Sequence, residues 1–317
     1  MKGYLIIILL QFWQIISIAQ DNNQEKYGLL PSTVNSEAEE LMPLMHPHGN
    51  ELYFSRVFHP ENYGGEYGGS DIWVSQINAN GDYEEAIKLP KPINNKENNF
   101  VIGFSADGKR MYLNNSYKSS SKYAIAIAYN LGDHWSDPSP IEIELPPHEG
   151  PIGMYMHPGE KILLISMNAS DSYGKEDLYV MTKDSSDNWS EPLNLGATIN
   201  TQGFEISPFL SEDGKTLYFA SEGHGGKGSA DIFKAVKKYN VWNVWSKPMN
   251  MGPIINSKGF EGYMSIFQKQ FLFASNRNRK LFDLYGYEES NLIYKDSTTV
   301  QIDRLLDEAK ELLQRDK

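Results

Sequence analysis

The chain has 317 residues, of which 40% are hydrophobic and 22% are charged, and its formal net charge at pH 7 is -12. This length allows one large or two medium domains whose core needs no covalent staples. The absence of cysteine excludes disulfides, thiolate metal sites and cysteine nucleophiles, and the acidic balance argues against nucleic acid or anionic lipid as a partner.

The N-terminus is an apolar run behind a single basic residue. Lys2 is followed by uncharged residues up to Gln20, with the small residue Ala19 near the end of the run. The pattern predicts a signal peptide over residues 1–19, cleaved after Ala19. An uncleaved membrane anchor fits less well, because the run is short for spanning and two glutamines interrupt it. We therefore expect an exported protein in the periplasm, at the cell surface or secreted, with no membrane span after cleavage.

A repeat with a period near 54 residues runs through most of the chain. One anchor is a glycine-centred turn followed by an apolar triplet, as in Gly214 before Leu217-Tyr218-Phe219. A second is an acidic–aliphatic–aromatic triplet, which opens at positions 71, 177, 231 and 283 and is replaced by Ala-Ile-Ala at 124, so that the five copies follow at intervals of 53, 53, 54 and 52. A third is Trp-Ser-x-Pro, at Trp135, Trp189 and Trp245. Three anchors in phase indicate a true structural repeat.

The repeat unit is typical of β-strands. Its clearest copy, from Glu205 to Phe233, places short aromatic and branched runs around an Asp213-Gly214 turn, which is a strong hairpin signal. Each copy supplies about four strands, and the strand after the turn is apolar on both faces. The sequence therefore predicts an all-β fold: a β-propeller of five four-stranded blades over residues 20–296.

A second pattern predicts how the ring closes. Asn-Thr or Asn-Ser precedes an acid by four or five residues at the start of blades four and five, and Asn35-Ser36 precedes Glu40 in the same way. Residues 26–34 thus resemble an outermost strand without a blade, and we expect them to complete the fifth blade formed by residues 263–288. This pairing would remove a free sheet edge. Residues 291–295 are the competing candidate for that strand.

Residues 297–317 change in character. Apolar residues recur there at helical spacing, which predicts an amphipathic C-terminal helix. Its apolar stripe either docks on the propeller or contacts a partner, and the pattern alone does not separate the two.

The repeat unit resembles a known family. Ser211-Glu212-Asp213-Gly214-Lys215 and Ser105-Ala106-Asp107-Gly108-Lys109, each followed by an apolar strand, are similar to the WD40-like, TolB-type (PD-repeat) β-propeller repeat of bacterial envelope proteins. The resemblance covers roughly residues 26–290. It implies a propeller fold and a role as an interaction module of the cell envelope.

Four acids recur at the start of the innermost strand, where they are expected beside the central channel: Glu40, Glu149, Glu205 and Glu261. One interpretation is a catalytic carboxylate pair, with Glu149 and Glu205 as the candidates for glycoside hydrolysis. The other is that a residue recurring with the repeat serves the hydrogen bonding of its own blade. We favour the structural interpretation, because the acids of a hydrolase occupy non-equivalent positions.

The loops between the second and third strands of each blade are glycine-rich and uneven in length. They carry the candidate ligand-binding residues Tyr63, Tyr67, His224, Lys227, Arg277 and Arg279. Binding residues often lie on such loops when a rigid scaffold holds them. Aromatic and cationic groups together would suit a glycan or a peptide.

Other chemistry finds no support in the motifs. The seven histidines show no metal-ligand spacing, no Gly-x-Ser-x-Gly is present, and no cofactor is indicated. The leading hypothesis is an exported, non-enzymatic propeller that binds an envelope protein or glycan. The alternative is a carbohydrate-active hydrolase that uses carboxylates in the central channel.

Overall fold

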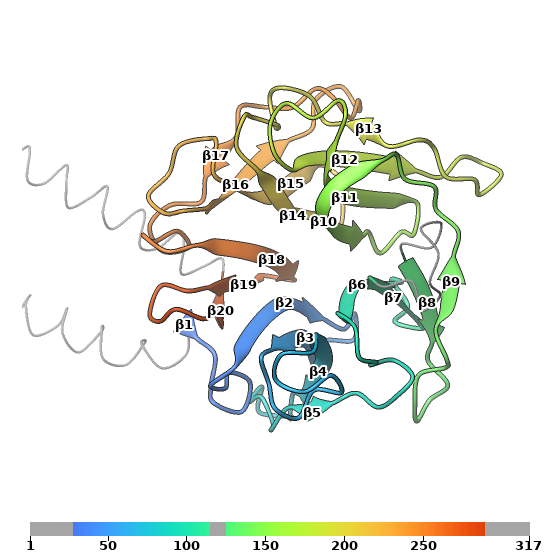
Figure 1. The fold of residues 1–317 in the computed structure, drawn as a ribbon, viewed down its shortest axis with the longest axis vertical. Coiled ribbons are helices and arrows are strands. Elements are labelled where there is room, and N and C mark those ends of the chain that lie inside the picture. The colour runs from blue at the N-terminus through green and yellow to red at the C-terminus, as the bar shows by residue number, and fades with distance from the viewer. Residues whose placement is uncertain (1–27, 115–124, 289–317) are drawn as a thin grey trace, which may run out of the picture.

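The computed structural model describes residues 28–114 and 125–288, which form five antiparallel four-stranded sheets placed as blades around a central axis (Figure 1). Blade 1 comprises β2 (Glu39–Met45), β3 (Glu51–Val57), β4 (Ser70–Gln76) and β5 (Ile87–Lys88). Blade 2 comprises β6 (Phe100–Phe104), β7 (Arg110–Asn114), β8 (Ile125–Tyr129) and β9 (Ser139–Ile141). Blade 3 comprises β10 (His148–Met156), β11 (Ile162–Ala169), β12 (Asp177–Thr182) and β13 (Leu193–Asn194). Blade 4 comprises β14 (Glu205–Leu210), β15 (Thr216–Ser221), β16 (Asp231–Val236) and β17 (Met249–Asn250).

The fifth blade confirms the predicted closure of the ring. β18 (Glu261–Phe267), β19 (Gln270–Ser275) and β20 (Asp283–Glu288) are completed by β1 (Gly28–Leu29), which pairs antiparallel with β20. β1 is therefore the outermost strand of the fifth blade, the position for which residues 291–295 were the alternative candidate. The signal peptide over 1–19, residues 291–295 and the helix over 297–317 lie outside the described residues. No helix in the described part of the chain is both long and apolar enough to span a membrane.

The two middle strands of each blade form the core because both of their faces are covered by neighbouring blades. In β15, Leu217 and Phe219 are fully buried and pack with Leu178 and Val180 of blade 3. The Asp-Gly hairpin that precedes β15 has Gly214 at φ 70°, the left-handed conformation that glycine adopts without steric cost. The predicted hairpins and strands are therefore present in phase with the repeat.

The tryptophans of Trp-Ser-x-Pro pack between blades. Trp245 is buried in the cluster shared by blades 3 and 4. Trp135 of blade 2 donates its indole N–H to the hydroxyl of Tyr53 in blade 1 at 3.3 Å. These contacts connect each of the two blades to the blade before it.

An asparagine after four of the five outermost strands extends that strand's hydrogen bonding. Asn35 accepts the Leu284 N–H at 2.8 Å and donates to the Leu284 carbonyl at 3.0 Å, much as a longer strand would. The same pair of bonds joins Asn94 to Ile72, Asn200 to Leu178 and Asn256 to Ile232. We call these four side chains the asparagine latches. They compensate for outermost strands that are only two residues long in β1, β5, β13 and β17.

The first prediction concerns the latch that closes the ring. Asn35→Ala should lower the free energy of unfolding by about 2–4 kcal/mol, because Asn35 is buried and the change leaves backbone groups of Leu284 and Leu30 without partners. Urea denaturation followed by tryptophan fluorescence measures this change. Asn80→Ala, at an exposed turn position, is the matched control and should change stability by less than about 0.5 kcal/mol. Equal effects of the two substitutions would contradict the role of the latch.

Candidate functional site

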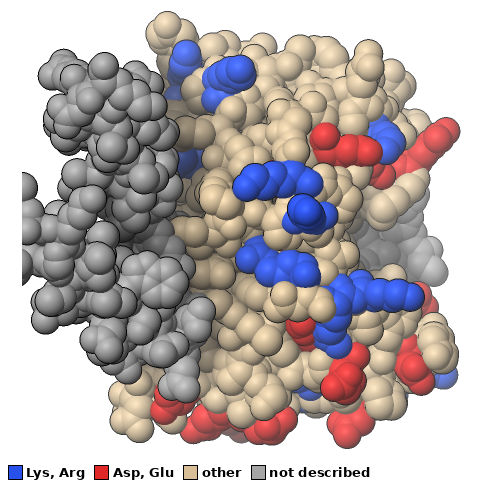
Figure 2. All heavy atoms as spheres, turned by 90° about the vertical axis from the view of Figure 1, so that its left-hand side faces the viewer, with Lys and Arg blue, Asp and Glu red and all other residues tan. Residues whose placement is uncertain are grey.

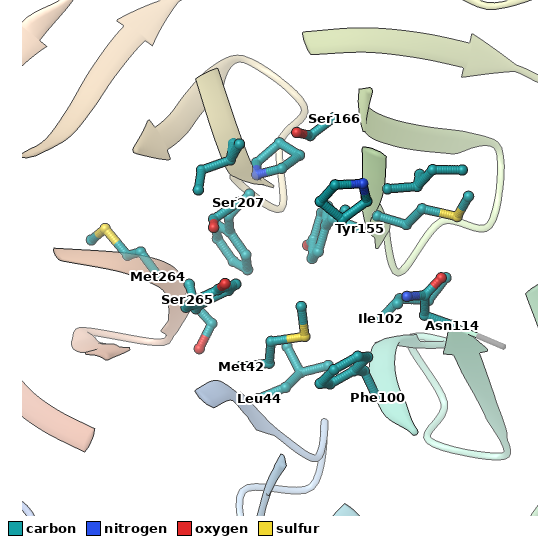
Figure 3. Close-up of a pocket in the computed structure, with 18 of the residues that line it drawn as sticks. Met42, Leu44, Phe100, Ile102, Asn114, Tyr155, Ser166, Ser207, Met264 and Ser265 are labelled. Atoms are coloured by element: carbon teal, nitrogen blue, oxygen red, sulfur yellow. The ribbon is translucent and has the colours of Figure 1, made fainter. Parts of the chain in front are cut away.

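The innermost strands carry the feature that shapes the candidate site: a β-bulge interrupts the pairing of each one. In blades 1, 4 and 5 the bulge holds Met42, Ser207 and Tyr263 at φ 55°, 54° and 54°. A left-handed conformation costs a residue other than glycine about 1–2 kcal/mol. A bulge re-aims side chains at the point where it occurs, and these three residues all line the central cavity (Figure 3).

The central cavity opens between the starts of the five innermost strands and has a volume of about 390 Å³. Its walls are mainly apolar, and they come from every blade. They include Met42, Leu44, Phe100, Ile102, Ile152, Met154, Tyr155, Phe204, Phe209, Phe260, Tyr263 and Met264. Figure 3 shows Met42, Phe100 and Tyr155 around the same space, whereas the side chain of Met264 points away from it into the core of the blade. Cavities of this size and lining are typical of sites for small ligands or inserted side chains.

Two serine hydroxyls in the cavity wall have no hydrogen-bond partner among the described residues. They are the Oγ atoms of Ser207 in blade 4 and Ser265 in blade 5, and Ser265 is only 4% exposed. A buried hydroxyl left unpaired costs about 1–3 kcal/mol. Both oxygens have almost no solvent-accessible surface, so neighbouring protein atoms cover them and they do not face the open space of the cavity.

Glu176 is the one charged side chain among the residues that line the central cavity. It belongs to the loop before β12 and is half-buried. Its Oε1 lies 3.8 Å from the position where a Cβ on Gly150 would stand, so Glu176 faces the start of β10. The remaining polar lining comes from Asn98, Asn114 and Ser166.

A second cavity of about 510 Å³ lies at the opposite end of the axis, near the turns between the first and second strands. Leu44, Tyr155 and Phe209 line both cavities and so lie between them. The rings of Tyr155 and Phe209 are 4.8 Å apart. The axis is thus narrowed by apolar side chains midway between its two ends.

The recurrent acids Glu205 and Glu261 do not face the central cavity. Both are fully buried, and each carboxylate accepts hydrogen bonds from the turn that precedes its strand. Glu205 accepts the Thr201 N–H at 2.7 Å and the Ser221 hydroxyl at 2.6 Å. Glu261 repeats this with Ser257 and Ser275. Burial raises the pKa of Glu205 above its ordinary value, although these hydrogen bonds lower it.

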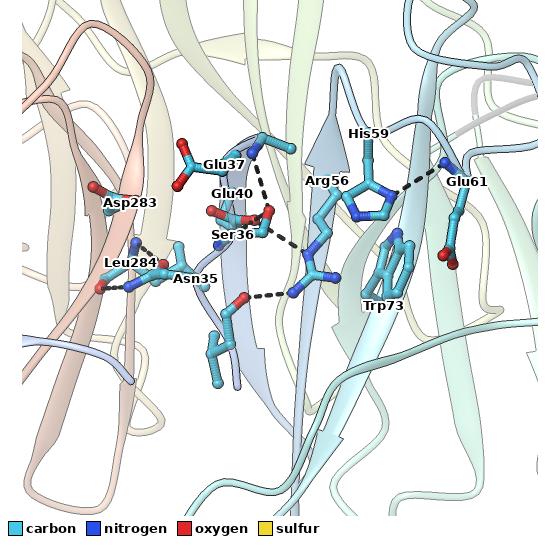
Figure 4. A network of polar contacts seen from close by, with 12 residues as sticks. Asn35, Ser36, Glu37, Glu40, Arg56, His59, Glu61, Trp73, Asp283 and Leu284 are labelled. Atoms are coloured by element: carbon cyan, nitrogen blue, oxygen red, sulfur yellow. Dashed lines mark hydrogen bonds and ion pairs between the residues drawn. The ribbon is translucent and has the colours of Figure 1, made fainter. Parts of the chain in front are cut away.

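Glu40 occupies the same position in blade 1 but has charged partners (Figure 4). Its Oε1 accepts the Ser36 hydroxyl at 2.5 Å and pairs with Arg56 Nε at 3.1 Å. Its Oε2 accepts no hydrogen bond and lies 3.6 Å from Arg279 Nη2. Burial raises the pKa of Glu40 to about 7, and Ser36 and the two arginines only partly oppose that rise. Arg56 in turn stacks on Trp73, 4.3 Å from its ring centre.

Glu149 does not share the environment of the other three acids. Glu149 is exposed and lies opposite Asn168 of β11. The residue of β11 that pairs with Asp177, the first residue of β12, is Met167. In blade 4 the residue equivalent to Met167 is Ser221, which pairs with Glu205 on one side and with Asp231 on the other. The expectation that all four acids are equivalent and line the channel is therefore corrected. A Glu149–Glu205 catalytic pair does not form, because Glu205 is buried and bonded within its own blade.

Three of the predicted ligand-binding residues are turned inward. His224 lies 2.7 Å from the Ile199 carbonyl through Nε2, and Arg277 donates to the Ile254 and Ile255 carbonyls. Arg279 donates to the Glu37 and Ala38 carbonyls and pairs with Asp283 at 2.6 Å. These side chains brace the connections between blades, and their polar atoms are occupied by the protein itself.

The other three predicted residues lie at the surface. Tyr67 is 83% exposed and lines a hollow of about 340 Å³ that shares Asn98 with the central cavity. Tyr63 is half-buried beneath Lys88, whose Nζ lies 4.1 Å from the ring centre. Lys227 is exposed, and only its backbone N–H is bound, to Asp231. The loop of blade 1 therefore adds an exposed aromatic group beside the cavity mouth.

Sequence reasoning missed Ser207, Ser265, Glu176 and the apolar wall. One signal was present: proline follows the bulged residue in blades 1 and 4, as Met42-Pro43 and Ser207-Pro208. Proline lacks an N–H and within a sheet marks a bulge or an edge. In the described part of the chain, no group of three or more acidic or histidine side chains is placed to hold a metal ion.

Comparison with known proteins shows the fold and no family. No protein-family model and no curated protein matches the chain. A solved structure named as a glycoside hydrolase is 11% identical, with a TM-score of 0.51, over 83% of this chain and 91% of the other. An endo-arabinase from Bacteroides thetaiotaomicron VPI-5482 is 13% identical, with a TM-score of 0.51, over 83% of this chain and 97% of the other.

TolB from Acinetobacter baumannii also matches, at 13% identity and a TM-score of 0.44, over 80% of this chain and 55% of the other. A TM-score at that level carries no argument, so membership of the TolB-type family stays a prediction. The likeness to the hydrolases, at such low identity, establishes the propeller architecture alone. The chemistry of the site must come from its own side chains.

The second prediction uses the buried carboxylate of Glu40. Its pKa is raised from 4.5 to about 7, so the folded chain binds this proton more tightly than the unfolded chain does. The free energy of unfolding should therefore fall as pH rises between these two values, by at most about 1.4 kcal/mol per pH unit. Glu40→Gln should lack this component. Urea denaturation at half-unit pH steps measures both slopes.

Glu191→Gln, at an exposed carboxylate, is the control and should keep the slope of the unmodified chain. Parallel curves for Glu40→Gln and the unmodified chain would show that Glu40 does not titrate in this window.

Proposed function

We propose that this chain is a binding protein, and that its ligand occupies the central cavity from the side of the long loops. The observation that carries the proposal is a mainly apolar cavity of about 390 Å³ whose wall comes from all five blades. A cavity of this size, lined by apolar and aromatic side chains with a few polar groups, is typical of a binding site.

A protein segment fits this cavity better than a glycan does. Sugar hydroxyls need many polar partners, and burying them against methionine and phenylalanine leaves hydrogen bonds unmade. An apolar side chain from a partner would instead contact Met42, Phe100 and Tyr155. We propose that the chain is exported and acts as an interaction module in the cell envelope, and that residues 297–317 add a further contact with the partner.

The third prediction tests occupancy of the cavity. N-phenyl-1-naphthylamine, an uncharged apolar fluorophore, should bind with a rise in fluorescence and a 1:1 stoichiometry. Ile152→Trp enlarges a half-buried side chain of the cavity wall and should weaken this binding at least tenfold, because it fills the space. Leu193→Trp, on exposed β13, is the matched control and should bind as the unmodified chain does. Equal binding by all three proteins would place the fluorophore elsewhere and contradict the proposal.

A hydrolase remains the second candidate, on one observation. Glu176 lies in the cavity wall beside Gly150, the neighbour of Glu149, and these two acids are not equivalent positions of the repeat. Glycoside hydrolysis requires two carboxyl groups in different roles, roughly 5–9.5 Å apart. Against this candidate, Glu176 is the one carboxylate that lines the cavity.

The fourth prediction separates the two functions. Incubation with arabino- and xylo-oligosaccharides, chosen from the names of the structural neighbours, should release no more reducing sugar than Glu176→Gln releases under the same conditions. A rate that is measurable in the unmodified chain and at least a hundredfold lower in Glu176→Gln would overturn the binding proposal in favour of hydrolysis.

A further inference from the structure

We infer that the central cavity selects its ligand by charge: it accepts an apolar group that is neutral or positively charged at the mouth, and it rejects one that carries a negative charge. This inference rests on the proposed function and specifies the ligand class of the same site.

The one charged residue that lines the cavity is acidic. No lysine or arginine is among its lining residues, whereas Glu176 is. Glu39 lies on the other side, next to Tyr263 of the cavity wall, where its charge adds to the effect of burial in raising the pKa of that phenol. Arg279 partly offsets the charge of Glu39, so the repulsion of an incoming anion comes mainly from Glu176, which acts more strongly beside apolar walls than it would in water.

Three cations on the loop face are paired with carboxylates of the protein itself. Arg277 lies 3.5 Å from Glu261, and Arg279 lies 2.6 Å from Asp283. Lys175, whose Nζ stands 5.5 Å from the ring centre of Phe204 in the cavity wall, pairs with Glu222 at 2.7 Å. Each of these three cations has a carboxylate partner, which weakens its attraction for an anionic ligand; Lys175 also interacts with Glu176.

The distribution of charge over the molecule agrees with this assignment. Figure 2 shows many lysine and arginine side chains across one outer side of the ring, the side on which β1 and β17 lie in Figure 1. The net charge of the chain is nevertheless -12. None of these lysine and arginine side chains is among the residues that line the central cavity.

The rim also offers aromatic faces to a cation. Phe204 and Phe260 line the cavity with their rings stacked 6.1 Å apart, and Phe282 meets Phe260 edge-to-face at 5.2 Å. All three are half-buried. A cation over such a face gains about 0.5–1 kcal/mol where it is exposed, and more where water is excluded.

The experiment displaces N-phenyl-1-naphthylamine with three compounds that share one ring system: 1-naphthylmethylamine, 1-naphthalenemethanol and 1-naphthoate. Because the amine and the carboxylate are both charged at pH 7, their desolvation costs are similar in kind and the sign of the charge is the main difference. The amine should compete about tenfold more strongly than the carboxylate, and the alcohol should fall between them or match the amine. Glu176→Gln should narrow the amine–carboxylate ratio to about two- or threefold.

Glu191→Gln removes the same charge from an exposed position away from the cavity and should keep the tenfold ratio. Equal competition by amine and carboxylate, or an unchanged ratio in Glu176→Gln, would overturn the inference while leaving a binding cavity in place. Failure of all three compounds to displace a fluorophore that does bind would also overturn it. No binding of the fluorophore itself would instead contradict the proposed function.

Discussion

The buried polar groups between blades are the constraint on which the rest of this propeller depends. Its outermost strands are so short that β1, β5, β13 and β17 leave backbone groups of the third strands without sheet partners. The asparagine latches supply those partners, and the backbone N–H of the next blade's first residue bonds back to the preceding blade, as Glu40 does to Phe282. A buried polar group without a partner costs about 1–3 kcal/mol. These hydrogen bonds between blades therefore set both the spacing and the order of the blades.

The acids belong to the same system. Glu205 and Glu261 each accept from a turn N–H and two hydroxyls, so their charge is surrounded by donors in a region without water access. Blade 3 departs from this arrangement: Pro146 and Pro147 precede its first strand, and Met167 takes the register position of a hydrogen-bonding serine. A buried acid would have no donors there. Because of these differences Glu149 is exposed, and blade 3 differs from the other blades at the cavity mouth.

The architecture could be predicted from the sequence because it repeats. Five phased copies of one hairpin unit, two of them with an Asp-Gly turn, predict five blades, and Asn35 beside Ser36 predicts which segment closes the ring. The site could not be predicted in the same way, because it depends on bulges whose left-handed residues, such as Tyr263, carry no glycine signal. Arg277 and Arg279 were expected at the surface, since their loops are rich in polar residues. They turn inward because carbonyls and acids distant in sequence need donors.

The shared ring explains why hydrolases match this chain in fold while its cavity has different walls. A propeller brings five first strands to one axis whatever side chains they carry, so the axis is a site for any chemistry that those side chains supply. Here the bulges place Met42, Ser207 and Tyr263 at that axis in a conformation that glycine would adopt without strain. Side chains other than glycine cost about 1–2 kcal/mol each in this conformation. Their presence at the axis fits the proposed role, in which a ligand contacts these side chains.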